Sequence, residues 1–489
     1  MDHPRYIDDL ADELLSDILS FLTGAEQPWI EPPLENPMPN TTSERPGERC
    51  DLDRFRLVCK RFMRIATPRK FSRFVLRFSK EGFQRLEDLL RMDRACHVKY
   101  FTYMVRPFYQ GSGTSPPVQY SGEKKNHFQG WTAILAQIGT HSPSVSQIHT
   151  HRLFTQQLVT DGGCDLILLR RAMEAFSSLR QIKLLRLQDQ ADEQLLGLIK
   201  ERSLNSVAHL SWEPACSRAI ANLGVALLES NCCAVKFVGP QISPDTGSRM
   251  LQVPSTTLSA LGQRLTSLDV NFYSSADMTS SIVRLSAAFR HFFLAATSLT
   301  DLHLGFSGRS PLDLKLEQVL HGAHWKRLRA FSLQGWRLGA GEIVGMARRH
   351  RRQLQDLRLS HIYLREGGRW SDILLVLHDE MERLERLDLR EIDYAKHLDA
   401  PSSDPVDTSL LPSTTTASAD RDTTHDTDLQ EIIIDDYLRL PWQDNPPRTL
   451  SPATVAKLRA LGVHELGDNG AYVRREQRVL WEAWVIASR

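Results

Sequence analysis

The strings LQDLRLS, residues 354–360, and LERLDLR, residues 384–390, contain the pattern that decides the fold of this chain. In each string an apolar residue is followed by a second three positions later and by a third two positions after that. Side chains two residues apart point to the same face of a β-strand, so Leu357 and Leu359 share one apolar face. A single strand cannot bury such a face alone. The pattern therefore predicts similar strands stacked beside it.

The same triplet returns along much of the chain, at spacings of 25 to 34 residues, which are typical of a solenoid. Eight copies are Leu179-Ile182-Leu184, Val207-Leu210-Trp212, Cys232-Val235-Phe237, Leu265-Leu268-Val270, Leu299-Leu302-Leu304, Leu328-Phe331-Leu333, Leu354-Leu357-Leu359 and Leu384-Leu387-Leu389. Weaker copies are Phe71-Phe74-Leu76 and Val98-Phe101-Tyr103, and a ninth is Leu429-Ile432-Ile434. Amphipathic stretches such as 192–202 and 371–384 lie between copies. We expect an α/β fold, a curved array with parallel strands inside and helices outside.

Two stretches near the N-terminus have helical rather than strand periodicity. Apolar residues recur every three or four positions over residues 7–22, and again from Leu52 to Ile65. The second pattern stops at Thr67-Pro68, because the residue before proline resists the helical conformation. Between the two lies 23–50, which contains six prolines and is expected to be an extended loop.

The strings IDDLADELLSDILSFL, residues 7–22, and DLDRFRLVCKRFMRIA, residues 51–66, resemble the F-box, a three-helix module. In that family the module docks substrate receptors of SCF-type ubiquitin ligases onto a Skp-family adaptor. Ala11 stands where the family usually has proline, and 23–50 replaces a short turn. The resemblance implies that adaptor binding rests on Leu10, Leu14, Leu15, Ile18, Leu19, Leu22, Leu57, Val58 and Phe62.

The repeats resemble the long, irregular leucine-rich repeats found behind F-boxes. Together the two resemblances imply a non-catalytic substrate-recognition subunit of an SCF-type cullin-RING E3 ubiquitin ligase, with a Skp-family adaptor, a cullin and a protein substrate as partners. Its mechanism would be proximity, which raises the effective concentration of substrate lysines near a charged conjugating enzyme. The alternative is a leucine-rich-repeat scaffold protein that does not join a ubiquitin ligase.

Period-two alternation identifies the side chains that face away from the buried side of the strands. If Leu268 and Val270 point inward, Ser267, Asp269 and Asn271 point outward. The same rule exposes Ser332 and Gln334 on a later strand. The expected substrate-binding residues are Asp269, Asn271, Asp301, His303, Asp356, Arg358, Arg386, Asp388 and Arg390. This row mixes both signs of charge, which suits a specific protein partner better than a polyanion. A merely solvated sheet face would have the same pattern.

Changes in composition predict four segments. Residues 1–70 form the F-box-like module with its insertion 23–50, and 71–398 form the solenoid with a loop insertion at 104–147. Residues 399–428, rich in Ser, Thr and Asp, are expected to be a disordered linker. Residues 429–489 are expected to hold the last repeat and a C-terminal cap.

The overall composition is that of a soluble protein without a general affinity for nucleic acid or membranes. Lys plus Arg number 60 and Asp plus Glu 59. No apolar run is long enough to span a bilayer. The seven scattered cysteines and the absence of a secretion signal predict a cytoplasmic or nuclear protein with reduced thiols.

Motifs for catalysis, metals and cofactors give no expectation of any of the three. Nucleotide-binding glycine loops and Cys-x-x-Cys pairs are absent. The histidines 141, 149 and 151 lack acidic or cysteine partners at metal-ligand spacing. The run Arg348, Arg349, His350, Arg351 and Arg352 is either a nuclear import or phosphate-binding patch or, as we prefer, a helix C-terminus complemented by cations.

Overall fold

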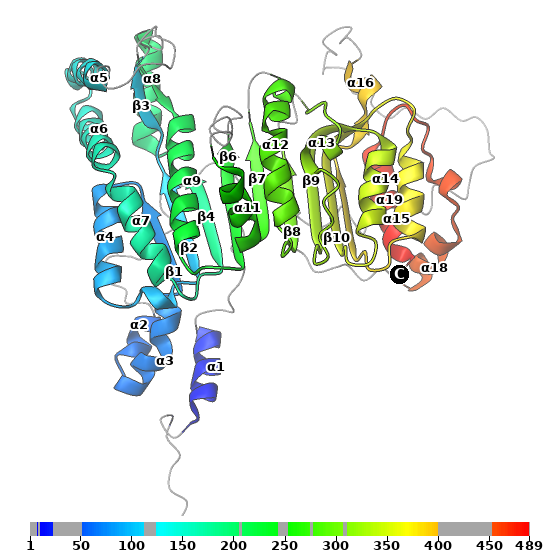
Figure 1. The fold of residues 1–489 in the computed structure, drawn as a ribbon, viewed down its shortest axis with the longest axis horizontal. Coiled ribbons are helices and arrows are strands. Elements are labelled where there is room, and N and C mark those ends of the chain that lie inside the picture. The colour runs from blue at the N-terminus through cyan, green and yellow to red at the C-terminus, as the bar shows by residue number, and fades with distance from the viewer. Residues whose placement is uncertain are drawn as a thin grey trace, which may run out of the picture. The chain divides into compact units, whose positions relative to one another are not determined.

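The computed structural model describes residues 7, 10–22, 51–111, 124–204, 208–242, 253–273, 277–306, 311–399 and 452–488. They belong to two compact units, Met1–Gly247 and Ser248–Arg489. In both units parallel β-strands alternate with helices, so the expected α/β class is confirmed (Figure 1).

The first unit begins with three helices and continues into a parallel sheet. Its helices are α1 (Asp12–Leu22), α2 (Asp51–Arg56), α3 (Lys60–Lys70), α4 (Lys80–Arg91), α5 (Lys124–Gly139), α6 (Pro143–Gly162), α7 (Cys164–Ala175), α8 (Gln190–Glu201) and α9 (Trp212–Glu229), with a 3-10 turn at Ala95–His97. Its strands are β1 (Arg73–Arg77), β2 (Tyr100–Val105), β3 (Phe108–Gly111), β4 (Gln181–Arg186), β5 (Ala208–Ser211) and β6 (Val235–Ile242). Strands β1, β2, β4 and β6 pair in that order, all parallel.

The repeated triplets supply the core of this sheet. Leu76 lies beside Tyr103, and Tyr103 beside Leu184, and all three side chains are buried. Helices α7 and α9 pack side by side on the sheet (Figure 1). The apolar faces of strands and helices therefore meet as the alternating pattern predicts.

The second unit repeats the same arrangement. Its helices are α11 (Ser255–Arg264), α12 (Thr279–Ala295), α13 (Glu317–Leu320), α14 (Ala340–Arg349), α15 (Trp370–Asp379), α16 (Ala395–Asp399), α18 (Pro452–Ala460) and α19 (Arg475–Ala487), with a 3-10 turn at Val463–Leu466. Its strands are β7 (Leu265–Phe272), β8 (Asp301–Gly305), β9 (Ala330–Leu338), β10 (Asp356–Leu364), β11 (Arg386–Arg390) and β12 (Asp393–Tyr394). Strands β7 to β11 pair in order and in parallel, and β12 pairs with β10.

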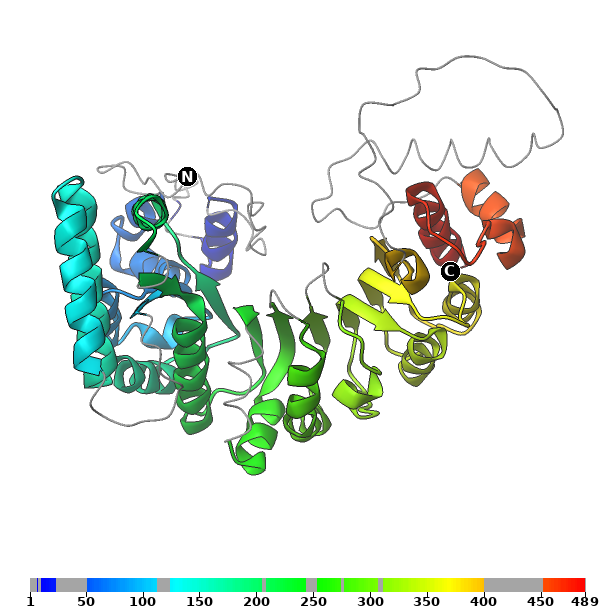
Figure 2. The same cartoon turned by 90° about the horizontal axis from the view of Figure 1, so that it is seen from above.

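Rows of leucine cross the second sheet from strand to strand. One row is Leu304, Leu333, Leu359 and Leu389, each directly beside the next and each buried. Helices α12 and α14 cover this side of the strands (Figures 1 and 2). Each fully buried leucine contributes about 1.5–3 kcal/mol to stability. The rows thus hold successive repeats together.

Helix α19 packs against the last strand, β11. The backbone N–H of Leu389 donates to a carboxyl oxygen of Glu482 at 2.7 Å, and Arg478 donates to the Leu389 carbonyl at 3.5 Å. The ring of Trp484 stacks on His378 of α15, with ring centroids 4.0 Å apart. The free edge of β11 is therefore covered by a helix rather than by another strand.

The second N-terminal helix differs from its sequence pattern in two ways. It is interrupted, because Cys59 is extended and its sulfur caps α3 by accepting from the Phe62 N–H at 3.5 Å. It also continues past Thr67, since Pro68 lies inside the last turn of α3. The Thr67 hydroxyl donates to the Met63 carbonyl at 2.6 Å, which helps to hold that turn together.

Two further expectations are wrong. The segment 104–147 is not only a loop, because it contains β3, α5 and the beginning of α6. Trp131 and Leu135 of α5 are buried, and the free energy gained by burying them offsets the conformational entropy lost when this segment is ordered. The triplet at 207–212 does not join the parallel sheet. Its strand β5 pairs antiparallel with β3, and Trp212 starts α9.

Several expected features lie outside the described residues. They are the insertion 23–50, the ninth triplet at 429–434 and the expected linker 399–428 except for Asp399, which ends α16.

Candidate adaptor-docking helices and substrate face

Helices α1, α2 and α3 form a small module with its own apolar core. Leu15 and Leu19 of α1 are fully buried there, together with Phe55, Phe62 and Ala66. The rings of Phe55 and Phe62 stack with centroids 4.5 Å apart, so α2 and α3 share one aromatic contact. The periodic leucines of α1 thus pack against the helices that follow the insertion.

Arginines of α3 fix α1 in place. Arg61 donates to Asp12 at 2.6 Å, and Arg64 donates to the other oxygen of the same carboxylate at 2.7 Å. These contacts, that of Arg61 first, hold the pKa of Asp12 below its usual value. Further along, Arg69 donates to the Ser16 carbonyl at 2.8 Å. Hydrogen bonds and ion pairs between α1 and α3 therefore surround the apolar contact between the same helices.

The structure divides the residues predicted to bind an adaptor into two groups. Leu15, Leu19 and Phe62 belong to the core of the module. Leu14, Leu57 and Val58 are exposed at 52%, 66% and 63%. Leu10 and Ile18 are partly buried, and the side chain of Leu22 lies outside the described part. A partner could contact only the exposed and partly buried side chains.

The predicted substrate residues lie on the side of strands β7 to β11 opposite the buried leucines. Strand register places them in three lateral rows. The rows are Ser267-Asp301-Ala330-Asp356-Arg386, Asp269-His303-Ser332-Arg358-Asp388 and Asn271-Gly305-Gln334-Ser360-Arg390. The whole predicted set is thus brought together. Ser267 is a correction, because it is only 3% exposed and does not belong to the accessible face.

His303 is the centre of a local hydrogen-bond cluster. Its Nδ1 lies 2.8 Å from the Ser332 hydroxyl and its Nε2 lies 3.2 Å from the Asn271 side-chain oxygen. Burial lowers the pKa of His303, against the opposing effect of Asp269. A Cβ added at neighbouring Gly305 would come within 1.9 Å of that Asn271 oxygen, so a larger residue there would displace the Asn271 side chain. This part of the face is therefore filled by its own polar groups.

Ion pairs within single strands order the other end of the face. Arg358 donates to both oxygens of Asp356, at 3.2 and 2.9 Å, and Arg390 pairs with Asp388 at 2.8 Å. The arginine side chains remain about half exposed, at 52% and 53%. Their charged ends are therefore accessible to a partner.

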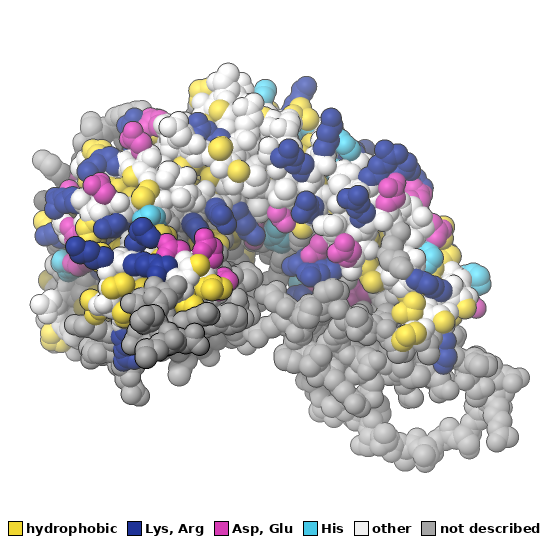
Figure 3. Space-filling view, turned by 90° about the horizontal axis from the view of Figure 1, so that it is seen from below, with side chains coloured by type: hydrophobic (Ala, Val, Ile, Leu, Met, Phe, Trp, Pro, Cys, Tyr) yellow, Lys and Arg dark blue, Asp and Glu magenta, His cyan; other side chains and the backbone are white. Residues whose placement is uncertain are grey.

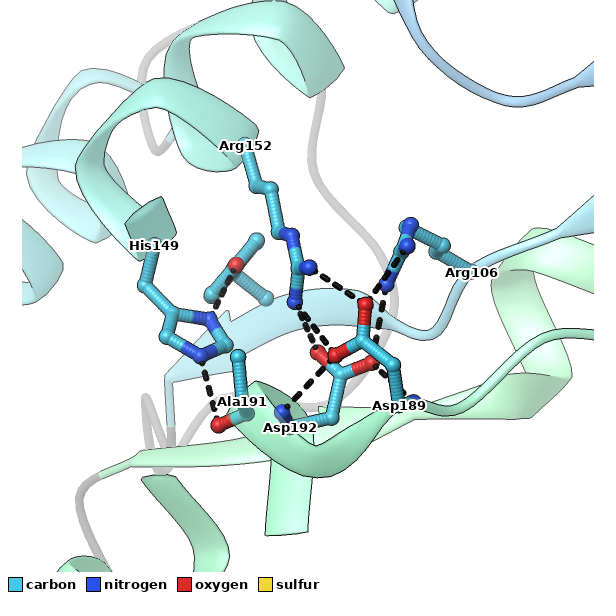
Figure 4. A network of polar contacts seen from close by, with 7 residues as sticks. Arg106, His149, Arg152, Asp189, Ala191 and Asp192 are labelled. Atoms are coloured by element: carbon cyan, nitrogen blue, oxygen red, sulfur yellow. Dashed lines mark hydrogen bonds and ion pairs between the residues drawn. The ribbon is translucent and has the colours of Figure 1, made fainter. Parts of the chain in front are cut away.

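A second polar centre, in the first unit, has no counterpart among the predicted residues (Figure 4). Arg106 and Arg152 each contact both Asp189 and Asp192, at 2.6–3.1 Å. Burial raises the pKa of Asp189, but hydrogen bonds from the two arginines outweigh it and lower the pKa overall. Only the pair Asp189 and Asp192, which caps α8, has a local sequence signal. The arginines come from distant positions.

The ion pairs among these four side chains connect the end of β2, helix α6 and the start of α8. Beside them the Nε2 of His149 lies 2.9 Å from the Ala191 carbonyl, which requires a proton on that nitrogen. Its Nδ1 therefore accepts from the Tyr109 hydroxyl at 2.7 Å. Burial lowers the pKa of His149, consistent with a neutral ring. Both ring nitrogens are thus engaged in structural contacts rather than available to a metal.

A cavity of about 250 Å³ adjoins this network and is lined by Arg77, Glu81, Thr155 and aromatic side chains. Among the described residues, no group of His, Cys, Asp and Glu has the arrangement of a metal site.

The basic run at 348–352 is largely paired. Arg348 binds Glu380 at 2.5 Å, Arg349 contacts Glu317, and Arg351 and Arg352 approach Glu382 at 3.8 and 3.6 Å. His350 is buried against Trp325, and burial lowers its pKa to about 4. The run therefore completes the end of α14 and its contacts with neighbouring repeats.

Comparison with known proteins gives no assignment. Neither protein-family models nor curated proteins yield a match to this chain. Across the described ranges no helix is both long and apolar enough to cross a membrane.

Proposed function

We propose that this chain is the substrate-recognition subunit of an SCF-type cullin-RING E3 ubiquitin ligase. Helices α1 to α3 dock a Skp-family adaptor, which connects the chain to a cullin, and the polar face of β7 to β11 holds a protein substrate. The observation that carries the proposal is the exposed apolar surface of the N-terminal helical module.

This surface is separate from the module's own core. Leu14, Leu57 and Val58 are more than half exposed, whereas the core is closed by Leu15, Leu19 and the Phe55–Phe62 stack. Leu14 lies on α1, and Leu57 and Val58 lie in the turn between α2 and α3; an adaptor that contacts all three would cover them as one apolar surface. Burying each against a partner would contribute up to about 1.5–3 kcal/mol. Together they could supply the central contacts of an interface.

The proposed mechanism requires binding surfaces and no nucleophile. The adaptor binds one module and the substrate binds another. The substrate lysines are thereby held near a conjugating enzyme, and the effective concentration of these lysines rises. We place the protein in the reducing environment of the cytoplasm or nucleus. The six cysteines of the described residues form no disulfide.

The substrate face is suited to selective protein recognition. Asp269 and Asp301 lie on β7 and β8, while Arg386 and Arg390 lie on β11. The β7–β8 end of the rows is therefore acidic, the β10–β11 end mixes Asp356 and Asp388 with three arginines, and the small side chains of Ala330 and Ser332 lie between them. A partner with the complementary order of charge would fit in only one direction.

Co-purification tests the adaptor assignment. Tagged wild-type chain should bring down a Skp-family adaptor and a cullin. The double variant Leu14→Asp with Val58→Asp should lose both, because docking would bury two unpaired carboxylates. Both positions are exposed in the free chain, so the variant should keep its wild-type fold.

The matched control is Leu294→Asp, an exposed leucine of α12, 49% accessible. It should retain adaptor and cullin. Capture of adaptor by the double variant at wild-type level, or failure of the wild-type chain to capture adaptor at all, would refute the proposal and favour a scaffold protein outside the ligase.

A further inference from the structure

The loops that lead into strands β9 and β11 carry five exposed cations. They are Lys326, Arg327, Arg329, Arg383 and Arg386, which we call the strand-start patch. Their side chains make no hydrogen bond or ion pair within the described part of the chain. This distinguishes them from the arginines at 348–352, which meet Glu317, Glu380 and Glu382. The conspicuous basic run is paired, and the unpaired cations come from two other loops.

Backbone hydrogen bonds bring the two loops into register. The Gln355 N–H donates to the Arg329 carbonyl at 2.8 Å, and the N–H groups of Glu385 and Arg386 donate to the Gln355 carbonyl at 2.8 and 2.9 Å. Adjacent strands lie about 4.8 Å apart, so Arg329 and Arg386 flank β10 at about 10 Å. The two loops therefore lie at the same end of the sheet, and Arg386 lies one residue further along its strand than Glu385, which is level with Arg329.

The patch concentrates positive charge on a nearly neutral chain. The formal net charge of all 489 residues is +1. Beside the five cations stand Glu385, which accepts from Gln355 at 3.5 Å, and Glu382, which Arg351 and Arg352 already approach. Figure 3 looks onto this end of the strands and shows Lys and Arg side chains on both sides of the view, with Asp and Glu side chains among them. Positive charge is thus in local excess.

We propose that the strand-start patch docks a segment of a protein partner rich in Asp and Glu. The cations are spread over the width of three strands instead of converging on one point, which suits carboxylates spaced along an extended segment better than a single phosphate group. About three residues of extended chain span the 10 Å between Arg329 and Arg386. The interspersed Glu382 and Glu385 break the single-sign stripe that nucleic acids require. Arginine pairs well with carboxylates because its planar guanidinium donates two parallel hydrogen bonds.

The inference goes beyond the ligase proposal. The strand-start patch shares Arg386 with the proposed substrate face, but it lies in the second unit and is separate from adaptor docking by α1 to α3. The two can therefore fail separately.

A peptide-binding measurement tests the patch. The probe is a fluorescein-labelled peptide of alternating Glu and Gly, compared with the same peptide carrying Gln for Glu, and binding to the full chain is followed by fluorescence anisotropy. Wild-type chain should bind the Glu peptide and not the Gln peptide. The affinity should fall as salt rises from about 0.05 to 0.5 M, because exposed charges are screened.

The double variant Arg329→Glu with Arg383→Glu should weaken binding of the Glu peptide by about tenfold or more. Arg284→Glu with Arg290→Glu, two exposed positions of α12, makes the same change in net charge away from the patch and should leave binding unchanged. Equal melting temperatures establish that both variants fold.

Three results would overturn the inference. The first is no binding of the Glu peptide by wild-type chain, and the second is equal binding by the patch variant. The third is tighter binding of a single-stranded oligonucleotide or a phosphoserine peptide that is lost in the same variant, which would assign the patch to a different partner.

Discussion

Replacing Glu482 with glutamine should remove a pH dependence of stability that originates in helix α19. The carboxyl group is 6% exposed and accepts from the Leu389 N–H at 2.7 Å. Burial raises its pKa from 4.5 to about 8, against the opposing effect of that hydrogen bond. Glutamine keeps an oxygen that can accept from Leu389 but cannot ionise. The comparison therefore isolates the charge.

Proton linkage determines how the free energy of unfolding of the wild-type chain changes with pH. The folded chain holds this proton up to about pH 8, whereas the unfolded chain releases it near pH 4.5. The free energy of unfolding therefore falls as pH rises through this window. A difference of about 3.5 pKa units, at 1.36 kcal/mol each, corresponds to about 5 kcal/mol, of which about 3 kcal/mol is lost by pH 7. Glu482→Gln should avoid this loss and be the more stable chain at pH 8.

Urea unfolding of both chains at pH 5, 6.5 and 8, followed by the fluorescence of the nine tryptophans, measures the difference. The control is Glu476→Gln, an exposed carboxylate on the same helix, which should follow the wild-type chain at each pH. A gap between wild type and Glu482→Gln that stays constant from pH 5 to pH 8 would refute the reasoning.

Two further substitutions test contacts in each unit. Arg152→Met should lower the free energy of unfolding of the first unit by about 1.5–3 kcal/mol, because the buried carboxylate of Asp192 and the partly exposed carboxylate of Asp189 keep only Arg106 as a charged partner; a loss below 1 kcal/mol in urea unfolding would contradict this. Gly305→Ala should cost about 1–3 kcal/mol by overpacking against the Asn271 side chain, and Asn271→Ala in the same chain should restore much of it. Simple additivity of these two changes in thermal unfolding would count against the contact.

The repeat could be predicted from the sequence because strand alternation is local. The triplets at 265, 299, 328, 354 and 384 became β7 to β11, and even the weaker copies at 71 and 98 became β1 and β2. The prediction for the triplet at 207 was wrong because the spacing of its apolar residues does not determine the strand with which it pairs. Its pairing with β3 depends on a segment almost a hundred residues earlier.

The sequence pattern did not predict helix α5, for a different reason. Its buried residues Trp131, Ile134, Leu135 and Ile138 have helical spacing, but the preceding run of Gly, Ser and Pro dominated the pattern. The network of Arg106 and Arg152 with two aspartates could not be predicted, since its members are up to 86 positions apart and form no motif. Long-range polar contacts of this kind depend on the completed fold.

Helix α19 covers the edge of β11 and so prevents another chain from pairing with this strand. A strand with unpaired N–H and C=O groups along one side is a template on which another chain can add. Here Glu482 and Arg478 occupy the backbone groups of Leu389 that a foreign strand would use. Shortened chains that lack α19 would leave this edge open to fibre-like self-association. The last helix therefore protects the protein against aggregation as well as completing its core.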